Sequence, residues 1–123
     1  MKNNQPTKRH KVYTIIFSLW SATILFLTSY PKLHIPIADK LWNSDKLAHF
    51  AVYTIFAWLF IKMNHHKTTK NNLRYLIIML CSIPILDELH QWPIPGRSFS
   101  FYDILADSLG FLLIIFLYSR KNI

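Results

Sequence analysis

The sequence predicts an all-α membrane protein, a bundle of four transmembrane helices with both termini in the cytoplasm. Hydrophobic residues make up 52% of the 123 residues and charged residues only 16%, whereas soluble domains carry about a quarter charged residues. The apolar residues come in long blocks, and the basic and acidic residues lie on opposite sides of these blocks. This pattern excludes a soluble enzyme and a disordered chain. The single cysteine, Cys81, excludes an internal disulfide framework and a cysteine zinc site.

The first predicted span, residues 12–30, is the clearest because it contains no charged residue. It follows a basic N-terminus, so a cleaved signal peptide is the alternative. Its apolar stretch exceeds the usual signal-peptide core of roughly 7–15 residues, and no A-x-A cleavage site follows. We therefore expect a retained helix.

Three further spans follow. Residues 46–62 form a short span that needs its polar flanks to cross a bilayer core of roughly 30 Å. Residues 75–92 are apolar until Asp87, and residues 102–118 carry two aspartates in their first half. We assign residues 1–123 to one four-helix domain.

Charge sets the orientation. Ten of the 14 lysines and arginines lie on one side of the four-span arrangement: Lys2, Lys8, Arg9, Lys11, Lys62, Lys67, Lys70, Arg74, Arg120 and Lys121. All six acidic residues lie towards the other side: Asp39, Asp45, Asp87, Glu88, Asp103 and Asp107. The positive-inside rule makes the basic side cytoplasmic. Topology and anionic lipids then explain the basic charge, and no nucleic-acid partner is predicted.

Ionisable side chains gather at the predicted outer ends of three spans, where they are costly and usually face a cavity or a partner. Asp45, His49 and Tyr53 are spaced i, i+4, i+8 and share one helix face. The third and fourth spans and the loop between them add further members: Asp87, Glu88, His90, Gln91, Arg97, Asp103 and Asp107. We expect these side chains to converge on a pocket that opens outward.

Several chemistries fit such a pocket. A carboxylate with a histidine performs general acid–base catalysis, and Arg97 can grip a phosphate or carboxylate bidentately. Carboxylates and histidines also bind divalent metals, but no H-E-x-x-H element or other ligand spacing is present, so we predict no metal and no cofactor. The alternative is a hydrogen-bond and ion-pair network that only locks the helices together.

Two features concern helix packing near the pocket. Ala106 and Gly110 lie on nearly the same face as Asp107, and small residues let helices approach closely in lipid. Pro84 precedes Glu88 by one turn and can kink the third span, because proline removes a helical hydrogen bond.

Two segments resemble the signatures of VanZ-like membrane proteins: DKLAHFAVYTIFAWLF, residues 45–60, and DELHQWPIPGRSFSFYDILADSLG, residues 87–110. The second is the more specific, with E-x-x-Q, then P-G-R, then D-x-x-x-D/N-x-x-G. Matched by position, the polar residues and the glycine of the family are Asp45, Lys46, His49, Glu88, Gln91, Arg97, Asp103, Asp107 and Gly110. Many members have Asn at the position of Asp107, which argues against a dedicated acid or base role for it.

The resemblance implies a multi-pass protein of the bacterial cytoplasmic (inner) membrane. The family takes its name from a protein linked to low-level resistance to teicoplanin, a lipoglycopeptide that acts outside this membrane, and no established mechanism comes with it. The expected partners are therefore a membrane lipid, a lipid-linked envelope molecule or a glycopeptide antibiotic.

We predict Glu88, His49 and Asp103 as catalytic residues of this site and Asp45, Lys46, Gln91, Arg97 and Asp107 as binding residues. In an enzymatic version, Glu88 is the general base, Arg97 holds an anionic group, and Asp103 orients His49 or Arg97. Two alternatives stay open: a binding or accessory module without catalysis, and a structural protein whose charges pair across helices. The oligomeric state is not predicted.

Overall fold

The computed structural model describes residues 7–31 and 42–120, which form an all-helical structure. It contains four helices: α1 (Lys8–Ser29), α2 (Trp42–Met63), α3 (Thr69–Gln91) and α4 (Phe101–Ser119). The predicted all-α class is confirmed. The parts of the orientation argument that concern Lys2, Asp39 and Lys121 lie outside the described residues.

Three of the described helical segments are long and apolar enough to cross a membrane: α1, α4 and the Asp45–Met63 part of α2. The third helix is as long, but it begins with TKNN and ends with DELHQ, so polar residues occupy both of its ends. The membrane character of the chain is confirmed, whereas a span by α3 and the cytoplasmic location of the termini stay predictions.

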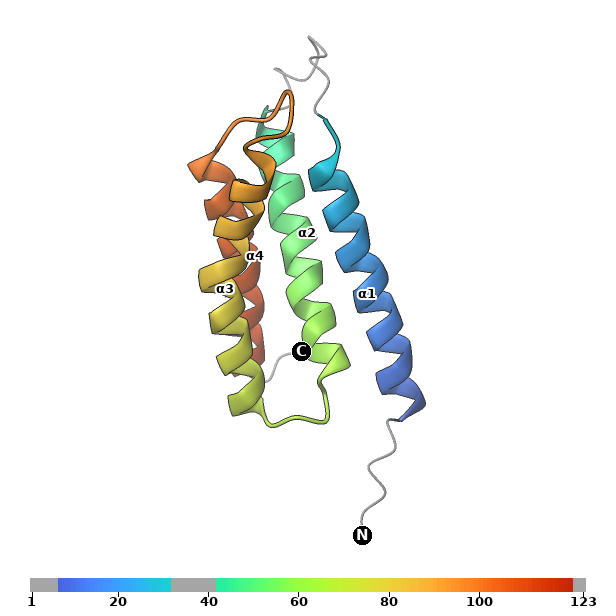
Figure 1. Ribbon diagram of the computed structural model, residues 1–123. Helices are drawn as coiled ribbons and strands as arrows, with labels where there is room; N and C mark the ends of the chain where they lie inside the picture. The colour runs from blue at the N-terminus through green and yellow to red at the C-terminus, as the bar shows by residue number, and fades with distance from the viewer. Residues whose placement is uncertain (1–6, 32–41, 121–123) are drawn as a thin grey trace.

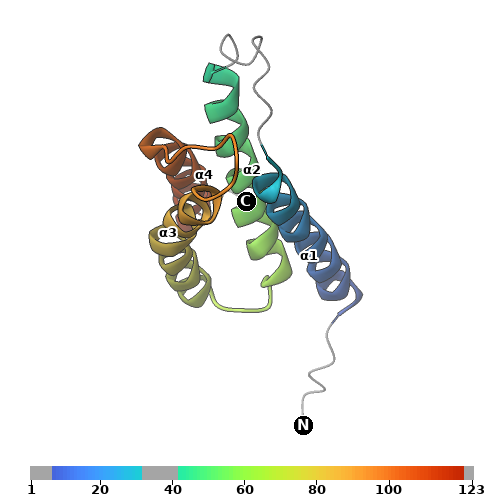
Figure 2. The ribbon, with the colours of Figure 1, turned by 45° about the horizontal axis from the view of Figure 1, so that its top comes forward.

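The helices run alternately up and down (Figure 1). Helix α4 packs against both α2 and α3, and α1 packs mainly against α2 with a smaller contact to α3. Figure 2 shows α1 at the side of the bundle, away from α4. The end of α3, the α3–α4 connection and the start of α4 lie at one end of the bundle, together with the start of α2. We call this end the site end.

Three helices begin at a hydroxyl N-cap. The side-chain oxygens of Thr7, Thr68 and Ser100 each accept a hydrogen bond from the backbone N–H three residues later. Such caps satisfy one of the unpaired N–H groups of a helix start. Helix α3 continues through Pro84, which is buried.

The apolar core lies where α2, α3 and α4 meet, and it includes Tyr53, Ala57, Leu76 and Phe111. Most side chains of α1 are exposed in the isolated chain, with only Ile24 and Thr28 buried. An apolar helix surface of this kind suits contact with lipid.

Polar contacts close the opposite end of the bundle. The amide nitrogen of Asn72 in α3 donates to the backbone oxygen of Asn64 at 3.1 Å and to the hydroxyl of Tyr118 in α4 at 3.0 Å. His10 Nδ1 lies 2.8 Å from the backbone oxygen of Met63, which ties the start of α1 to the end of α2. This end therefore has its own polar network, separate from the site end.

Helices α2 and α4 touch at Gly110. A Cβ added to Gly110 would lie 2.8 Å from the backbone oxygen of Phe50 and 2.8 Å from the backbone nitrogen of Thr54. Ala106, one turn earlier, is also buried. The expected close approach of small residues is present, and it sets how α4 lies on α2 just below Asp107.

We predict that Gly110→Ala lowers the melting temperature of the purified protein, because the added methyl group meets backbone atoms that cannot rotate away. Overpacking of this kind costs about 1–3 kcal/mol. Thermal unfolding in one detergent measures the effect, with Leu109→Ala as the control, since Leu109 is exposed on the same helix. Equal melting of Gly110→Ala and wild type would contradict the close packing.

Candidate functional site

The site end holds two polar contacts between α2 and α4. His49 Nδ1 lies 2.8 Å from Asp107 Oδ1, and the Lys46 ammonium donates to the Asp103 carboxylate. Lys46 also lies 3.6 Å from the Asp45 carboxylate. Residues 103 and 107 are one helical turn apart, as are residues 45 and 49. Two successive turns of α2 therefore face two successive turns of α4.

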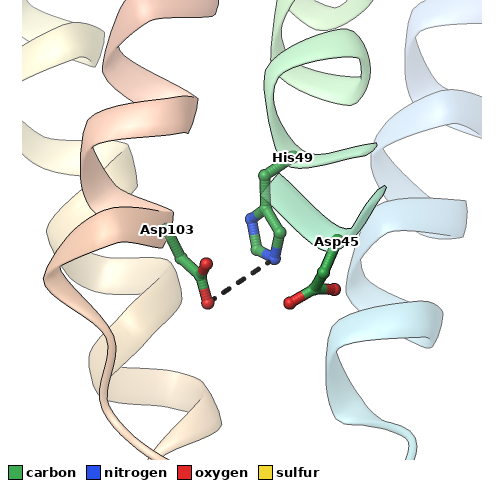
Figure 3. A group of neighbouring side chains, drawn as sticks. All are labelled: Asp45, His49 and Asp103. Carbon is green, nitrogen blue, oxygen red and sulfur yellow. Dashed lines mark ion pairs between the residues drawn. The ribbon is translucent and has the colours of Figure 1, made fainter. Parts of the chain in front are cut away.

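His49 stands between carboxylates. Figure 3 shows the Nε2 end of the ring lying between the carboxylates of Asp103 and Asp45, with a dashed line to Asp103. The Nε2–Oδ2 distance to Asp103 is 3.9 Å, longer than a hydrogen bond, whereas Nδ1 is within hydrogen-bond distance of Asp107. The geometry therefore makes Asp107, and not Asp103, the hydrogen-bond partner that orients His49.

Glu88 brings α3 into the site. Its side chain is 1% exposed, and Oε2 accepts a hydrogen bond from the backbone N–H of Ser100 at 2.8 Å. The other oxygen, Oε1, has no hydrogen-bond partner among the described residues. Ser100 also caps α4 and lies 3.4 Å from the Lys46 ammonium. Ser100 was not among the predicted site residues, although its position three residues before Asp103 is a capping signal.

A tight backbone turn sets the position of Arg97. Residues Ile94–Arg97 close with a backbone hydrogen bond of 3.1 Å, and Gly96 at the third position has a φ of 79°. Pro followed by Gly with positive φ is the signature of a type II turn. The Pro and Gly of the P-G-R element therefore form the turn that precedes Arg97.

All the hydrogen bonds of Arg97 to described residues go to neutral oxygens. It donates to Gln91 Oε1 at 2.6 Å and to the backbone oxygens of Leu27 and Tyr30 at 2.7 and 3.2 Å. These two carbonyls close α1, where a cation also suits the helix dipole. In the described structure Arg97 holds the end of α1, and Lys46, not Arg97, contacts Asp103.

Asp87 is one of the side chains expected to converge on the pocket, although no catalytic or binding role was predicted for it. Gln91 donates to Asp87 Oδ2 at 2.9 Å, so a chain of contacts leads from Arg97 through Gln91 to Asp87. Asp87 also offers an oxygen that lies within 4.8 Å of ligand atoms of His49 and Asp107. The i, i+4 spacing to Gln91 was a signal for it.

Negative charge exceeds positive charge in this cluster. Four carboxylates are buried, with exposures of 8% for Asp87, 1% for Glu88, 7% for Asp103 and 0% for Asp107. Within the described ranges, no lysine or arginine forms an ion pair with Asp87, Glu88 or Asp107. Buried charges are costly unless paired. Glu88 Oε1 and Asp107 Oδ2 have no hydrogen-bond partner among the described residues.

A cavity of about 420 Å³ lies beside the cluster, between α1, α2 and α3. Its lining is largely apolar and includes Phe17, Ile24 and Ile83. Asp87 and His90 also line it, so Asp87 belongs to both the cavity and the polar cluster.

We predict that Lys46→Met destabilises the protein and that adding Asp103→Asn restores most of the loss, because the single change leaves a buried carboxylate without its cation. Breaking a fully buried pair costs roughly 3–5 kcal/mol. Lys46 keeps 20% of its side chain exposed, so we expect the lower end of that range. Thermal unfolding of the two single variants and the double variant checks this, and additive losses in the double variant would refute the pairing.

A second prediction concerns the clamp on α1. Arg97→Met removes hydrogen bonds from a charged donor, which contribute about 1.5–3 kcal/mol, so backbone amides in the last turn of α1 should exchange at least about tenfold faster. Hydrogen–deuterium exchange measured on peptides spanning residues 24–31 tests this, with Arg74→Met as control because Arg74 is exposed on α3. Unchanged exchange in Arg97→Met would show that the clamp does not hold α1.

Comparison with known proteins gives one family match. The family described as VanZ/LLP1 matches residues 2–122, almost the whole chain. No curated protein and no solved structure gives a significant match. The two signature segments noted in the sequence contribute the residues that meet at the site end. The chain belongs to the VanZ/LLP1 family of membrane proteins.

Proposed function

We propose that the protein binds an amphiphile at the outer face of the bacterial cytoplasmic membrane, with the polar headgroup in the cluster and an acyl chain in the cavity. One observation carries this proposal: the apolar cavity and the polar cluster meet at Asp87. A pocket with one apolar part and one polar part matches a molecule built the same way. The basic residues near the opposite end of the bundle support the outward orientation.

The charge of the cluster limits which kinds of headgroup can bind. Three buried carboxylates, those of Asp87, Glu88 and Asp107, form no ion pair with a lysine or arginine among the described residues, so hydroxyl and ammonium groups fit better than bare anions. An envelope lipid, a lipid-linked precursor and a lipoglycopeptide of the teicoplanin type all combine such groups with a long hydrocarbon chain. The membership in a family named for teicoplanin resistance supports this set.

The same geometry supports a catalytic version. The unpaired Oε1 of Glu88 is available to accept a proton, and the His49–Asp107 pair is an imidazole oriented by a carboxylate. In this version Glu88 is the general base, while His49 acts on the other side of the headgroup and Asp103 holds Lys46. In the non-catalytic version the pocket sequesters or presents the ligand unchanged.

We predict saturable binding of teicoplanin to the purified protein in nanodiscs, and at least tenfold weaker binding of the same glycopeptide core without its acyl chain, because only the acylated form fills the cavity. Ser21→Phe, which narrows the cavity, and Glu88→Gln, which alters the headgroup site, should each weaken binding. Native mass spectrometry measures the bound ligand, and Leu109→Ala is the control.

An envelope lipid extract replaces the drug in a parallel measurement. Lipids that remain bound to wild type but not to Ser21→Phe identify the natural ligand class, and a mass change after incubation distinguishes catalysis from binding. The proposal is wrong if neither drug nor lipid binds, or if both variants bind as wild type does.

A further inference from the structure

We propose that His49, Asp87 and Asp107 bind a first-row divalent cation, Mn²⁺ or Zn²⁺, at the centre of the site end. The three residues come from α2, α3 and α4, and each offers one ligand atom within 4.8 Å of the other two. His49 Nδ1 and Asp107 Oδ1 are already 2.8 Å apart. Zinc lies about 2.0–2.2 Å from nitrogen and oxygen ligands. Binding therefore requires that the His49–Asp107 hydrogen bond open, with release of its proton to solvent, and that Asp87 move inward.

An unpaired atom points to the ion independently of this clustering. Asp107 is fully buried at 0% exposure, and its Oδ2 has no hydrogen-bond partner among the described residues. Burying a carboxylate oxygen without a partner is costly. A cation bound by Asp107 would satisfy that oxygen and remove the cost.

A second histidine–carboxylate group, formed by Asp45, His49 and Asp103, also brings its ligand atoms together (Figure 3). The ammonium of Lys46 already contacts Asp103 there and lies 3.6 Å from Asp45. An ion in that group would have to displace or repel this ammonium. In the part of the chain that the structure describes, no lysine or arginine pairs with Asp87 or Asp107, so charge favours the inner group.

The donor atoms indicate which ions fit. One imidazole nitrogen and two carboxylates suit Mn²⁺ and Zn²⁺ better than Ca²⁺, which prefers six to eight oxygens, or Cu⁺, which prefers sulfur. Gln91 donates to Asp87 Oδ2 and so orients this ligand from outside the group. Three protein ligands leave a coordination position for a bound molecule.

A divalent metal is one of the chemistries that the sequence allows, but the sequence predicts none because it contains no ligand-spacing motif. Such a motif is absent here because each ligand comes from a different helix. The inference does not depend on the proposed amphiphile. If both hold, the ion also supplies positive charge to a cluster that otherwise carries an excess of carboxylates, and it extends the accepted headgroups to anionic ones.

The test uses the full chain without an affinity tag, in detergent, after treatment with a chelator. His65 and His66 are exposed neighbours, with ring centroids 6.0 Å apart, and would bind metals on the surface. All proteins therefore carry His65→Asn and His66→Asn. Isothermal titration with MnCl₂ and with ZnCl₂ measures stoichiometry and affinity, and thermal unfolding with and without each salt reports stabilisation by the ion.

We expect one ion per chain for at least one of the two salts, together with a rise in melting temperature. In the same background, Asp87→Asn and Asp107→Asn should each weaken binding at least tenfold, whereas Asp45→Asn should bind as the parent does. Size-exclusion elution shows whether each variant is folded. If Asp107→Asn does not fold, the ion binding of Asp87→Asn alone tests the proposal.

Two results would overturn the proposal. The first is that the parent binds neither ion. The second is that Asp45→Asn loses binding while Asp87→Asn keeps it, which would place the ion in the outer group. Because no lipid or drug is present, failure here is distinct from failure of the proposed amphiphile binding.

Discussion

The burial of four carboxylates at one end of a membrane bundle is the constraint on which the rest of the structure depends. Buried carboxylates have little access to water, so each carboxylate oxygen needs a partner from the protein or from a ligand. The chain supplies Lys46 to Asp103, His49 to Asp107, the backbone N–H of Ser100 to Glu88, and Gln91 to Asp87. These contacts leave Glu88 and Asp107 each with one unpaired oxygen, and the proposed functions account for those two atoms.

Backbone features hold these partners in place. Gly110 lets α4 approach α2 until their backbones nearly touch, which fixes how Asp107 meets His49. The turn with positive φ at Gly96 directs Arg97 back towards the end of α1. In this way α1, which buries few of its own side chains, is attached to the site end and closes one wall of the apolar cavity.

The sequence was sufficient for the four helices and for most of the polar cluster, because both follow from local rules. Long apolar blocks predict helices, and i, i+4 spacing places Asp103 with Asp107 and Asp45 with His49 on single faces. The sequence was not sufficient to predict which side chains of the cluster contact one another. Whether His49 meets Asp103 or Asp107 depends on the register between α2 and α4, which is set by contacts distant in sequence such as the one at Gly110. The contacts of Arg97 with the end of α1, and the closeness of Asp87 to His49 and Asp107, could not be predicted for the same reason, since these neighbours come from other helices.

The most direct test of the central claim, that this cluster is a binding or catalytic site and not a lock, is the melting temperature of Glu88→Gln compared with wild type in one detergent. The substitution keeps the shape of the side chain and removes a buried charge with an unpaired oxygen. Functional sites hold strain that such neutralisation relieves, so the account predicts an unchanged or higher melting temperature. A large drop, comparable to the loss from breaking the Lys46–Asp103 pair, would contradict it and identify the cluster as a structural network.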